Sequence, residues 1–151
     1  MSFHVRQATI HDLDRVAPLF DAYRQFYGQG ADLARARGFL AERFAHHESV
    51  ILLALDEAGQ GVGFVQLYPS FSSVRTVRTY VLNDLFVAPA ARRQGVAAAL
   101  LRAAAEYGRA MGVASLSLST AHDNFAAQRL YESLGWKHDE QFREYGLTLV
   151  D

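Results

Sequence analysis

The sequence predicts a single α/β domain, residues 1–151, in which helices pack against a mixed β-sheet. Half of the 151 residues are hydrophobic and 21% are charged, a balance typical of a globular protein rather than a disordered one. Strand-like apolar runs alternate along the chain with segments whose apolar residues recur at helical spacing. No repeat, low-complexity tract or linker interrupts this order. A chain of this length buries about 70% of its unfolded surface.

The N-terminal third is predicted to hold one strand and two helices. Residues 3–8 resemble a first strand. Thr9 precedes Asp12 by three residues, which is the spacing of a capping box and marks a helix start. The apolar residues that follow are spaced by three and four: Leu13, Val16, Phe20, Tyr23 and Tyr27. Glycines at 28 and 30 end this helix, and Asp32 caps a second helix that reaches about residue 46.

The middle of the chain is predicted to form three strands. Residues 49–55 and 61–68 are apolar runs on either side of a turn-forming segment at 56–60, which is the signal of a hairpin. Residues 69–73 are predicted to be a loop. A long strand is then expected over residues 76–87.

The C-terminal part is predicted to hold two helices and three strands. An alanine-rich helix is expected over residues 96–111, and a half-buried strand over 113–119, where leucines alternate with serines. Asn124 is a good cap for a short helix. Residues 136–140 and 142–150 are predicted to close the chain as two strands.

The bend between the long strand and the alanine-rich helix predicts an anion site. It contains two arginines and Gly95 directly before the helix. The first backbone N–H groups of a helix have no partner within the helix, and the helix dipole adds partial positive charge there. Because Gly95 has no Cβ, a phosphate can approach the backbone closely. We therefore expect a ligand that carries phosphate.

Three phosphate-binding patterns compete for this bend. A P-loop requires a Lys-Ser/Thr pair, and none follows Gly95. A dinucleotide fingerprint requires three glycines, and Ala97 and Leu100 stand where two of them would be. The third pattern is Gln/Arg-x-x-Gly-x-Gly/Ala, and Arg92, Gly95 and Ala97 fit it. This is the coenzyme A loop of the GCN5-related N-acetyltransferase (GNAT) family.

A second motif carries the same resemblance. Residues 124–136 are similar to the family pattern Asn-x-x-Ala-x-x-x-Tyr-x-x-x-Gly-Phe/Trp, and the predicted order of elements matches the family order over nearly the whole chain. The resemblance implies the GNAT fold, a mixed and mostly antiparallel sheet of about six to seven strands flanked by about four helices. Residues 23–27 and 83–87 look most like the branch that includes polyamine acetyltransferases and fungal histone and D-amino-acid acetyltransferases.

The resemblance implies acetyl-CoA as the donor substrate. The pantetheine arm would pair with the strand edge at residues 85–87 as an added strand does, and the pyrophosphate would meet the amides of residues 93–98. The implied donor-binding residues are Leu85, Phe86, Val87, Arg92, Arg93, Gln94, Gly95, Val96, Ala97, Ala98 and Asn124. The arginines could instead form a solvated turn, and Asn124 could serve only as a helix cap.

Two residues are candidates for catalysis. An alkyl ammonium has a pKa of roughly 10.4, so about one amine in 10³ is neutral at pH 7 and able to attack a thioester. Polyamine enzymes of the family often carry an acidic residue at the position held here by Asn83. The amide of an asparagine cannot accept the proton. Asp84 is the nearest replacement, as a base acting directly or through water, as a charge that orients a cationic acceptor, or as a structural residue. Tyr131 matches the family tyrosine beside the thioester sulfur and could instead be ordinary core.

Aromatic residues and one asparagine are candidates for the acceptor site. The candidate acceptor-binding residues are Tyr27, Tyr68, Phe71 and Asn83. Phe26 is at least as well explained as core. Glu42 and His46 are spaced i, i+4 and adjoin a second histidine, but without further ligands we expect no metal site.

Composition narrows the class of partner. A net charge of −1 argues against nucleic acid, and the absence of cysteine excludes thiolate catalysis and disulfides. The N-terminus lacks the apolar region of a signal peptide and no apolar run has the length of a membrane span, so we expect a cytoplasmic protein with no membrane partner.

The sequence thus predicts an acetyl-CoA-dependent N-acetyltransferase acting on a primary amine of a small molecule, such as a polyamine or an amino acid. The alternatives are an acetyltransferase for protein lysine or N-terminal amines and a non-catalytic acyl-CoA-binding module. Dimers are frequent in the family, and the apolar C-terminal strands would suit a homodimer.

Overall fold

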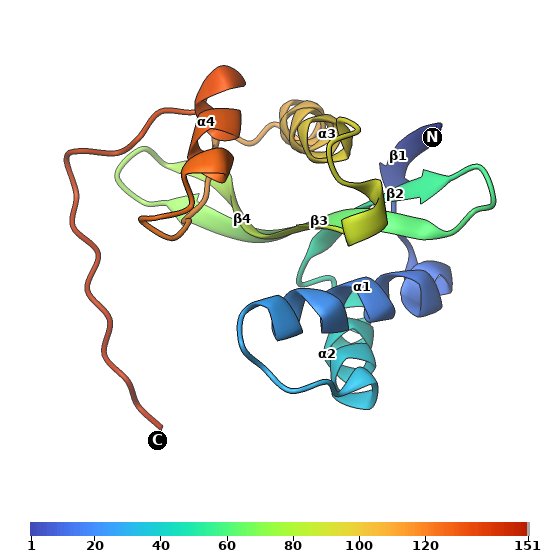
Figure 1. Cartoon of the computed structure of the whole chain (residues 1–151). Coiled ribbons are helices and arrows are strands. Elements are labelled where there is room, and N and C mark those ends of the chain that lie inside the picture. The colour runs from blue at the N-terminus through green and yellow to red at the C-terminus, as the bar shows by residue number, and fades with distance from the viewer. Residues whose placement is uncertain (151) are drawn as a thin grey trace. The chain divides into compact units, whose positions relative to one another are not determined.

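A five-stranded sheet forms the centre of the first 119 residues (Figure 1). The computed structural model describes residues 1–150. It divides into two compact units, Met1–Ser119 and Thr120–Asp151, and each is described here by itself. The strands follow one another in chain order across the sheet, antiparallel except for the parallel pair β4 and β5. Their bounds are β1 Phe3–Gln7, β2 Val50–Asp56, β3 Gly61–Ser72, β4 Val77–Val87 and β5 Ser115–Ser117.

Helices cover both faces of this sheet (Figure 1). Phe64 of β3 packs against Phe20 of α1, and a Cβ placed on the neighbouring Gly63 would meet Val96 and Leu100 of α3. Successive residues of a strand point to opposite faces, so α1 and α3 lie on opposite sides. The helices are η1 Ile10–Asp12, α1 Leu13–Phe26, α2 Leu33–Ala45, η2 Pro89–Ala91, α3 Val96–Ala110 and, in the second unit, α4 Phe125–Ser133. Among the residues described, no helix has the length and apolar character needed to cross a membrane.

The main core lies between the sheet and the two N-terminal helices. Residues 51–55 of β2 are buried on both faces, as expected for a strand covered by helices on either side. Large fully buried side chains of this core include Val16, Leu40, Ile51, Leu53 and Phe64. Their burial from several separate segments holds the first unit together through the hydrophobic effect.

The predicted helix starts are confirmed. Thr9 and Asp12 form the expected capping box before α1, and the Asp32 side chain accepts a hydrogen bond from the backbone N–H of Arg35 at the start of α2. Asp12 is 2% exposed and forms two hydrogen bonds of 2.7 and 2.8 Å with the Arg6 guanidinium of β1. Those bonds hold the pKa of the Asp12 carboxyl well below its ordinary value. This ion pair ties the first strand to the helix that follows it.

The loop predicted at residues 69–73 is wrong, because β3 continues to Ser72 and pairs with β4 as far as Val77. Proline lacks a backbone N–H and is tolerated in a strand where one edge has no neighbour. The pairing of β3 with β2 ends at Leu67, so Pro69 lies past the last β2 contact and loses no hydrogen bond there. The extension lengthens the hairpin on which the candidate site is built.

The sheet has fewer strands than the six to seven expected. The predicted strands at 136–140 and 142–150 are absent from the part of the chain described, residues 1–150. Tyr145, Leu147 and Leu149 keep the alternation that predicted a strand, but their side chains are exposed. A strand needs a hydrogen-bonded neighbour as well as an apolar pattern, and no neighbour pairs with this segment in the described chain.

The Arg6–Asp12 pair is predicted to stabilise the fold in a pH-dependent way. We expect Asp12→Asn to lower the free energy of unfolding at pH 7 by about 1–3 kcal/mol, the usual range for hydrogen bonds to a charged group. Because the folded-state pKa of Asp12 is depressed, its contribution is present above about pH 4 and is lost as the pH falls below that value. Urea unfolding at pH 7 and pH 3 measures both effects.

Asp14→Asn is the matched control, because the exposed Asp14 makes one surface ion pair with Arg37 and should change stability by less than about 0.5 kcal/mol. An Asp12→Asn protein as stable as the wild type at pH 7 would contradict this role for the pair.

Candidate active site

A β-bulge at Asn83 is the central feature of the site. Gln66 of β3 pairs with Asp84 of β4, and the next residue of β3, Leu67, pairs with Leu82. Asn83 therefore has no partner across the β3–β4 ladder. An extra residue in one strand bends it and re-aims the side chains that follow.

The bulge moves the side chains of β4 from one face of the sheet to the other. Tyr80 precedes the bulge and packs against Tyr107 of α3, with ring centroids 6.1 Å apart. Phe86 follows the bulge and packs against Tyr23 of α1, with centroids 6.3 Å apart. In a regular strand, side chains six residues apart lie on the same face, so without the bulge the two rings would share a face. The same change of face brings the Asp84 carboxylate to the α1 side.

Asp84 is a buried carboxylate, 3% exposed, held by amide groups. Its Oδ1 accepts a hydrogen bond of 2.9 Å from Nδ2 of Asn83, and its Oδ2 accepts one from Nε2 of Gln66. Burial raises the pKa of the Asp84 carboxyl above its ordinary value of 3.8, although the bonds from Gln66, Asn83 and Tyr23 oppose the rise. A carboxylate with a raised pKa binds a proton more readily, as a general base for a neutral-pH reaction must.

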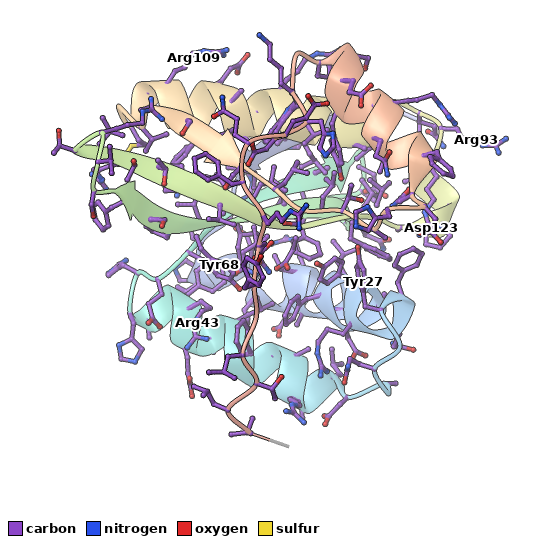
Figure 2. The ribbon with its side chains drawn as sticks, turned by 90° about the vertical axis from the view of Figure 1, so that its left-hand side faces the viewer. Tyr27, Arg43, Tyr68, Arg93, Arg109 and Asp123 are labelled. Atoms are coloured by element: carbon purple, nitrogen blue, oxygen red, sulfur yellow. The ribbon has the colours of Figure 1, made fainter. Side chains whose placement is uncertain are left out.

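Two tyrosines flank this carboxylate. The Tyr23 hydroxyl donates to the backbone carbonyl of Asn83 over 3.1 Å, and burial together with the Asp84 charge raises the pKa of Tyr23. The pKa of Tyr68 is raised to about 12, mainly by burial and then by the Asp84 charge. Figure 2 shows Tyr68 on the side of the sheet that faces α1 and α2, with Arg43 of α2 on the same side. Both tyrosines are half-buried, so each is partly accessible to solvent.

The second half of β4 has a free edge suited to an extended ligand. β5 pairs with β4 only at residues 79–81. In the described residues no strand adjoins residues 82–87 on that side, while Leu85, Phe86 and Val87 remain paired with β3 on the other. Unpaired backbone groups on such an edge can bind the amides of an added chain.

The bend after β4 has the geometry expected of an anion site. Gly95 adopts a left-handed conformation, with φ of 81°, at the N-cap of α3, and no side chain caps this helix. Arg93 is also left-handed, with φ of 62°, and its side chain extends into solvent (Figure 2). The first-turn N–H groups of α3 are therefore available to a phosphate. Val96 is buried and anchors the helix, while the neighbouring Ala97 and Ala98 are half-buried.

The side chains of Arg92 and Gln94 form hydrogen bonds within the bend. Nε of Arg92 donates to the carbonyl of Val87 over 3.0 Å, and its guanidinium lies 5.6 Å from the centre of the Phe86 ring. Nε2 of Gln94 donates to the carbonyl of Ala90 over 3.3 Å. These bonds favour the structural alternative for Arg92, whereas Arg93 remains exposed for ligand contact.

The structure brings together only some of the predicted acceptor residues. Asn83 and Tyr68 lie beside Asp84. Tyr27 is exposed and packs edge-on against Tyr23, with centroids 5.1 Å apart, so it lies next to the same group. Phe71 is 72% exposed and stands an odd number of residues from Tyr68 along β3, so it points to the opposite face.

Sequence reasoning missed two residues of this site. Gln66 is a polar residue inside the apolar run of β3 and is fully buried, and such a residue needs a polar partner. That signal was available in the sequence, but the partner was not. The sequence predicts Tyr23 as part of the apolar face of its helix and of the segment 23–27 that carries the branch resemblance, whereas its hydroxyl contact with Asn83 depends on the fold.

The second unit contains the remaining candidates. Asn124 accepts a hydrogen bond of 3.3 Å from the backbone N–H of Ala127 and so caps α4. Tyr131 of α4 lies beside Trp136, with ring centroids 6.2 Å apart. Within residues 1–150 no three side chains of the metal-binding types gather into a site, and Glu42 instead pairs with Arg43.

Comparisons with known proteins agree on one family. The model of the acetyltransferase (GNAT) family matches residues 14–136. An N-acetyltransferase of Bacillus subtilis, YhfO, named as uncharacterized, is 48% identical over 146 residues, which cover 97% of both chains. A "probable acetyltransferase" of Haemophilus influenzae is 33% identical and covers 91% of this chain and 92% of its own. A crystal structure described as a "probable acetyltransferase" has a TM-score of 0.93 and 46% identity, covering 98% of this chain and 99% of that one.

Replacing the buried charge is predicted to stabilise the protein. The folded-state pKa of Asp84 is raised, so the wild type loses stability as the pH rises from about 4 through that pKa. We expect Asp84→Asn to have the higher free energy of unfolding at pH 8, by about 1.4 kcal/mol for each unit of the raised pKa. Urea unfolding of both proteins between pH 4 and pH 8 should show the difference growing with pH. A variant less stable than the wild type at pH 8 would contradict this description of Asp84.

Proposed function

This chain belongs to the acetyltransferase (GNAT) family, and we propose that it transfers the acetyl group of acetyl-CoA to a primary amine of a small molecule. Family membership makes it an acyltransferase. The finer proposal, a small amine acceptor, rests on one observation above all. A buried carboxylate with a raised pKa lies beside two half-buried tyrosines at the bulge of β4.

The donor side of the proposal uses β4 and the bend that follows it. The backbone edge at residues 85–87 would pair with the pantetheine amides, and the α3 N-terminus would hold the pyrophosphate with help from Arg93. The left-handed Gly95 supports this assignment, because a side chain there would be strained and would crowd a phosphate. We assign Asn124 to the donor side by resemblance only.

The acceptor side uses Asp84 and its neighbours. A positively charged amine must lose a proton before its nitrogen can attack, which at pH 7 costs about 4–5 kcal/mol. Asp84 can accept that proton and also attracts a cation. Because the carboxylate is 3% exposed, the proton would reach it through a water molecule or a hydroxyl such as that of Tyr23. Tyr27, Tyr68 and Asn83 would border the bound amine.

The proposed reaction is a direct transfer in a ternary complex. The amine nitrogen forms a bond to the thioester carbon, the carbon–sulfur bond breaks, and the electron pair leaves with sulfur. Asp84 takes the proton that the ammonium loses before the attack, and the second proton leaves nitrogen to solvent as the amide forms. Tyr131, assigned by resemblance only, donates a proton or a hydrogen bond to the departing thiolate. A phenol with a pKa of about 10 can fulfil either role.

A panel of acceptors tests the proposal against its alternatives. Free thiol release from acetyl-CoA would be followed with polyamines, amino acids and other small primary amines, and with lysine-bearing and N-terminal peptides. We expect release with at least one small amine and a higher kcat/KM than with any peptide. Preference for peptides would favour a protein acetyltransferase, and acetyl-CoA binding without thiol release would favour a non-catalytic module.

Asp84 is predicted to be required for turnover. We expect Asp84→Asn to lower kcat/KM for the best amine at least about tenfold at pH 7, since positioned acid–base groups contribute about 10²–10⁴. The loss should shrink at high pH, where more of the amine is already neutral. Asp14→Asn, an exposed change on α1, is the control. Wild-type kinetics in Asp84→Asn would remove this residue from the mechanism.

Tyr131 is predicted to assist the leaving group. We expect Tyr131→Phe to fold normally and to lose at least about 90% of turnover, measured as thiol release at saturating acetyl-CoA. Tyr145→Phe is the control from the same unit, because the Tyr145 side chain is exposed. Full activity in Tyr131→Phe would end the general-acid assignment.

A further inference from the structure

Gln66 is the most deeply buried polar residue beside the candidate base. Its side chain is fully buried on β3, directly across from Asp84 in the β3–β4 ladder. One end of its amide, Nε2, donates to Oδ2 of Asp84. The other end, Oε1, has no hydrogen-bond partner among residues 1–150, although it is shielded from solvent.

An unpaired buried carbonyl costs stability, and a leucine of similar volume would avoid that cost. The Nε2 bond to Asp84 uses the donor end of the amide and leaves its buried oxygen able to accept a second bond. A side-chain amide offers two donor hydrogens at one end and an acceptor at the other, and a half-turn about its last bond exchanges the two. Gln66 can thus present either a donor or an acceptor to the same oxygen of Asp84.

We infer that Gln66 is a positioning residue that stabilises Asp84 in both of its protonation states. When Asp84 is charged, Nε2 of Gln66 donates a hydrogen bond to it, and this bond is present in the structure. When Asp84 has taken the amine proton on Oδ2, the amide turns and Oε1 accepts the bond from the new hydroxyl. No atom leaves either side chain except the proton that Asp84 receives and returns. This inference rests on the proposed role of Asp84 as the base.

The other groups around Asp84 also offer donors and acceptors, but they are more exposed than Gln66. Asn83 holds Oδ1 from β4, and its exposed amide can also bond to water. The Tyr23 hydroxyl of α1 faces Asp84 and the Asn83 carbonyl. Tyr68 of β3 lies near enough for the charge of Asp84 to raise its pKa. The positive charge of Arg43 on α2 opposes the rise in the pKa of Tyr68. Of these groups only Gln66 combines complete burial with an unused acceptor.

The first test is the pH profile of two Gln66 variants. Gln66→Leu removes a hydrogen bond from both forms of Asp84. Because the bond to the charged form is the stronger, the acid limb of kcat/KM should move to higher pH by about one to two units. Gln66→Glu keeps the shape but places two carboxyls together, which also raises the pKa of the pair and moves the limb the same way. KM for acetyl-CoA should stay within about twofold, since the Gln66 side chain is fully buried and its hydrogen bond goes to Asp84 rather than to a residue proposed to bind the donor.

Gln25→Leu is the matched control. Gln25 also donates from Nε2 to an aspartate, Asp21 of the same helix, over 3.3 Å. Its removal should leave the acid limb within about 0.3 unit of the wild type. A limb that moves equally in Gln25→Leu and Gln66→Leu would overturn the inference, because the effect would then be a general one of losing an amide.

A second readout needs no activity. The pH range over which the free energy of unfolding falls reports the folded-state pKa of Asp84, and in Gln66→Leu it should extend to higher pH by the same one to two units. An unchanged range together with an unchanged kinetic limb would overturn the role of Gln66. If instead Asp84→Asn keeps the wild-type pH profile, the proposed base is wrong and the inference falls with it, so the two failures are distinguishable.

Discussion

One extra residue in β4 determines the chemistry available to this fold. The bulge at Asn83 carries the strand's side chains from the α3 face to the α1 face, so that Tyr80 and Asp84 point to opposite sides of the sheet. Without the bulge the carboxylate would face α3, away from both tyrosines. The same stretch of β4 loses its β5 neighbour after residue 81, which opens the edge proposed for the donor. The proposed acceptor and donor features thus arise from neighbouring residues of one strand.

The first unit contains two buried aspartates with opposite energetics. Asp12 is paired with a guanidinium, its pKa is depressed, and its charge stabilises the fold. Asp84 is held by amides and hydroxyls, its pKa is raised, and its charge is costly to bury. A buried charge that lowers stability is common in active sites, and the proposed role of Asp84 in proton transfer would account for it here. The unpaired oxygen of Gln66 belongs to the same compromise.

Local signals in the sequence predicted most of the fold. The capping box at Thr9, the Asp32 cap and the start of the alanine-rich helix after Gly95 depend on neighbouring residues, and each is found where expected. The predictions that were wrong depend on partners distant in sequence. The alternation of Tyr145 and Leu147 predicts a strand only if another strand pairs with it, and Pro69 stays in β3 only because β2 has already ended. The bulge is likewise a property of the β3–β4 register, so the contact between Gln66 and Asp84 could not be derived from the sequence.

The central claim is that Asp84 is a buried carboxyl ready to accept a proton. A ¹³C NMR titration of the aspartate side-chain carboxyls, with Asp84→Asn identifying the Asp84 signal, measures this directly in the ligand-free protein. We expect a midpoint for Asp84 clearly above the ordinary value of 3.8. A midpoint at or below 3.8 would mean that its hydrogen bonds outweigh its burial, and would contradict the assignment of Asp84 as the base.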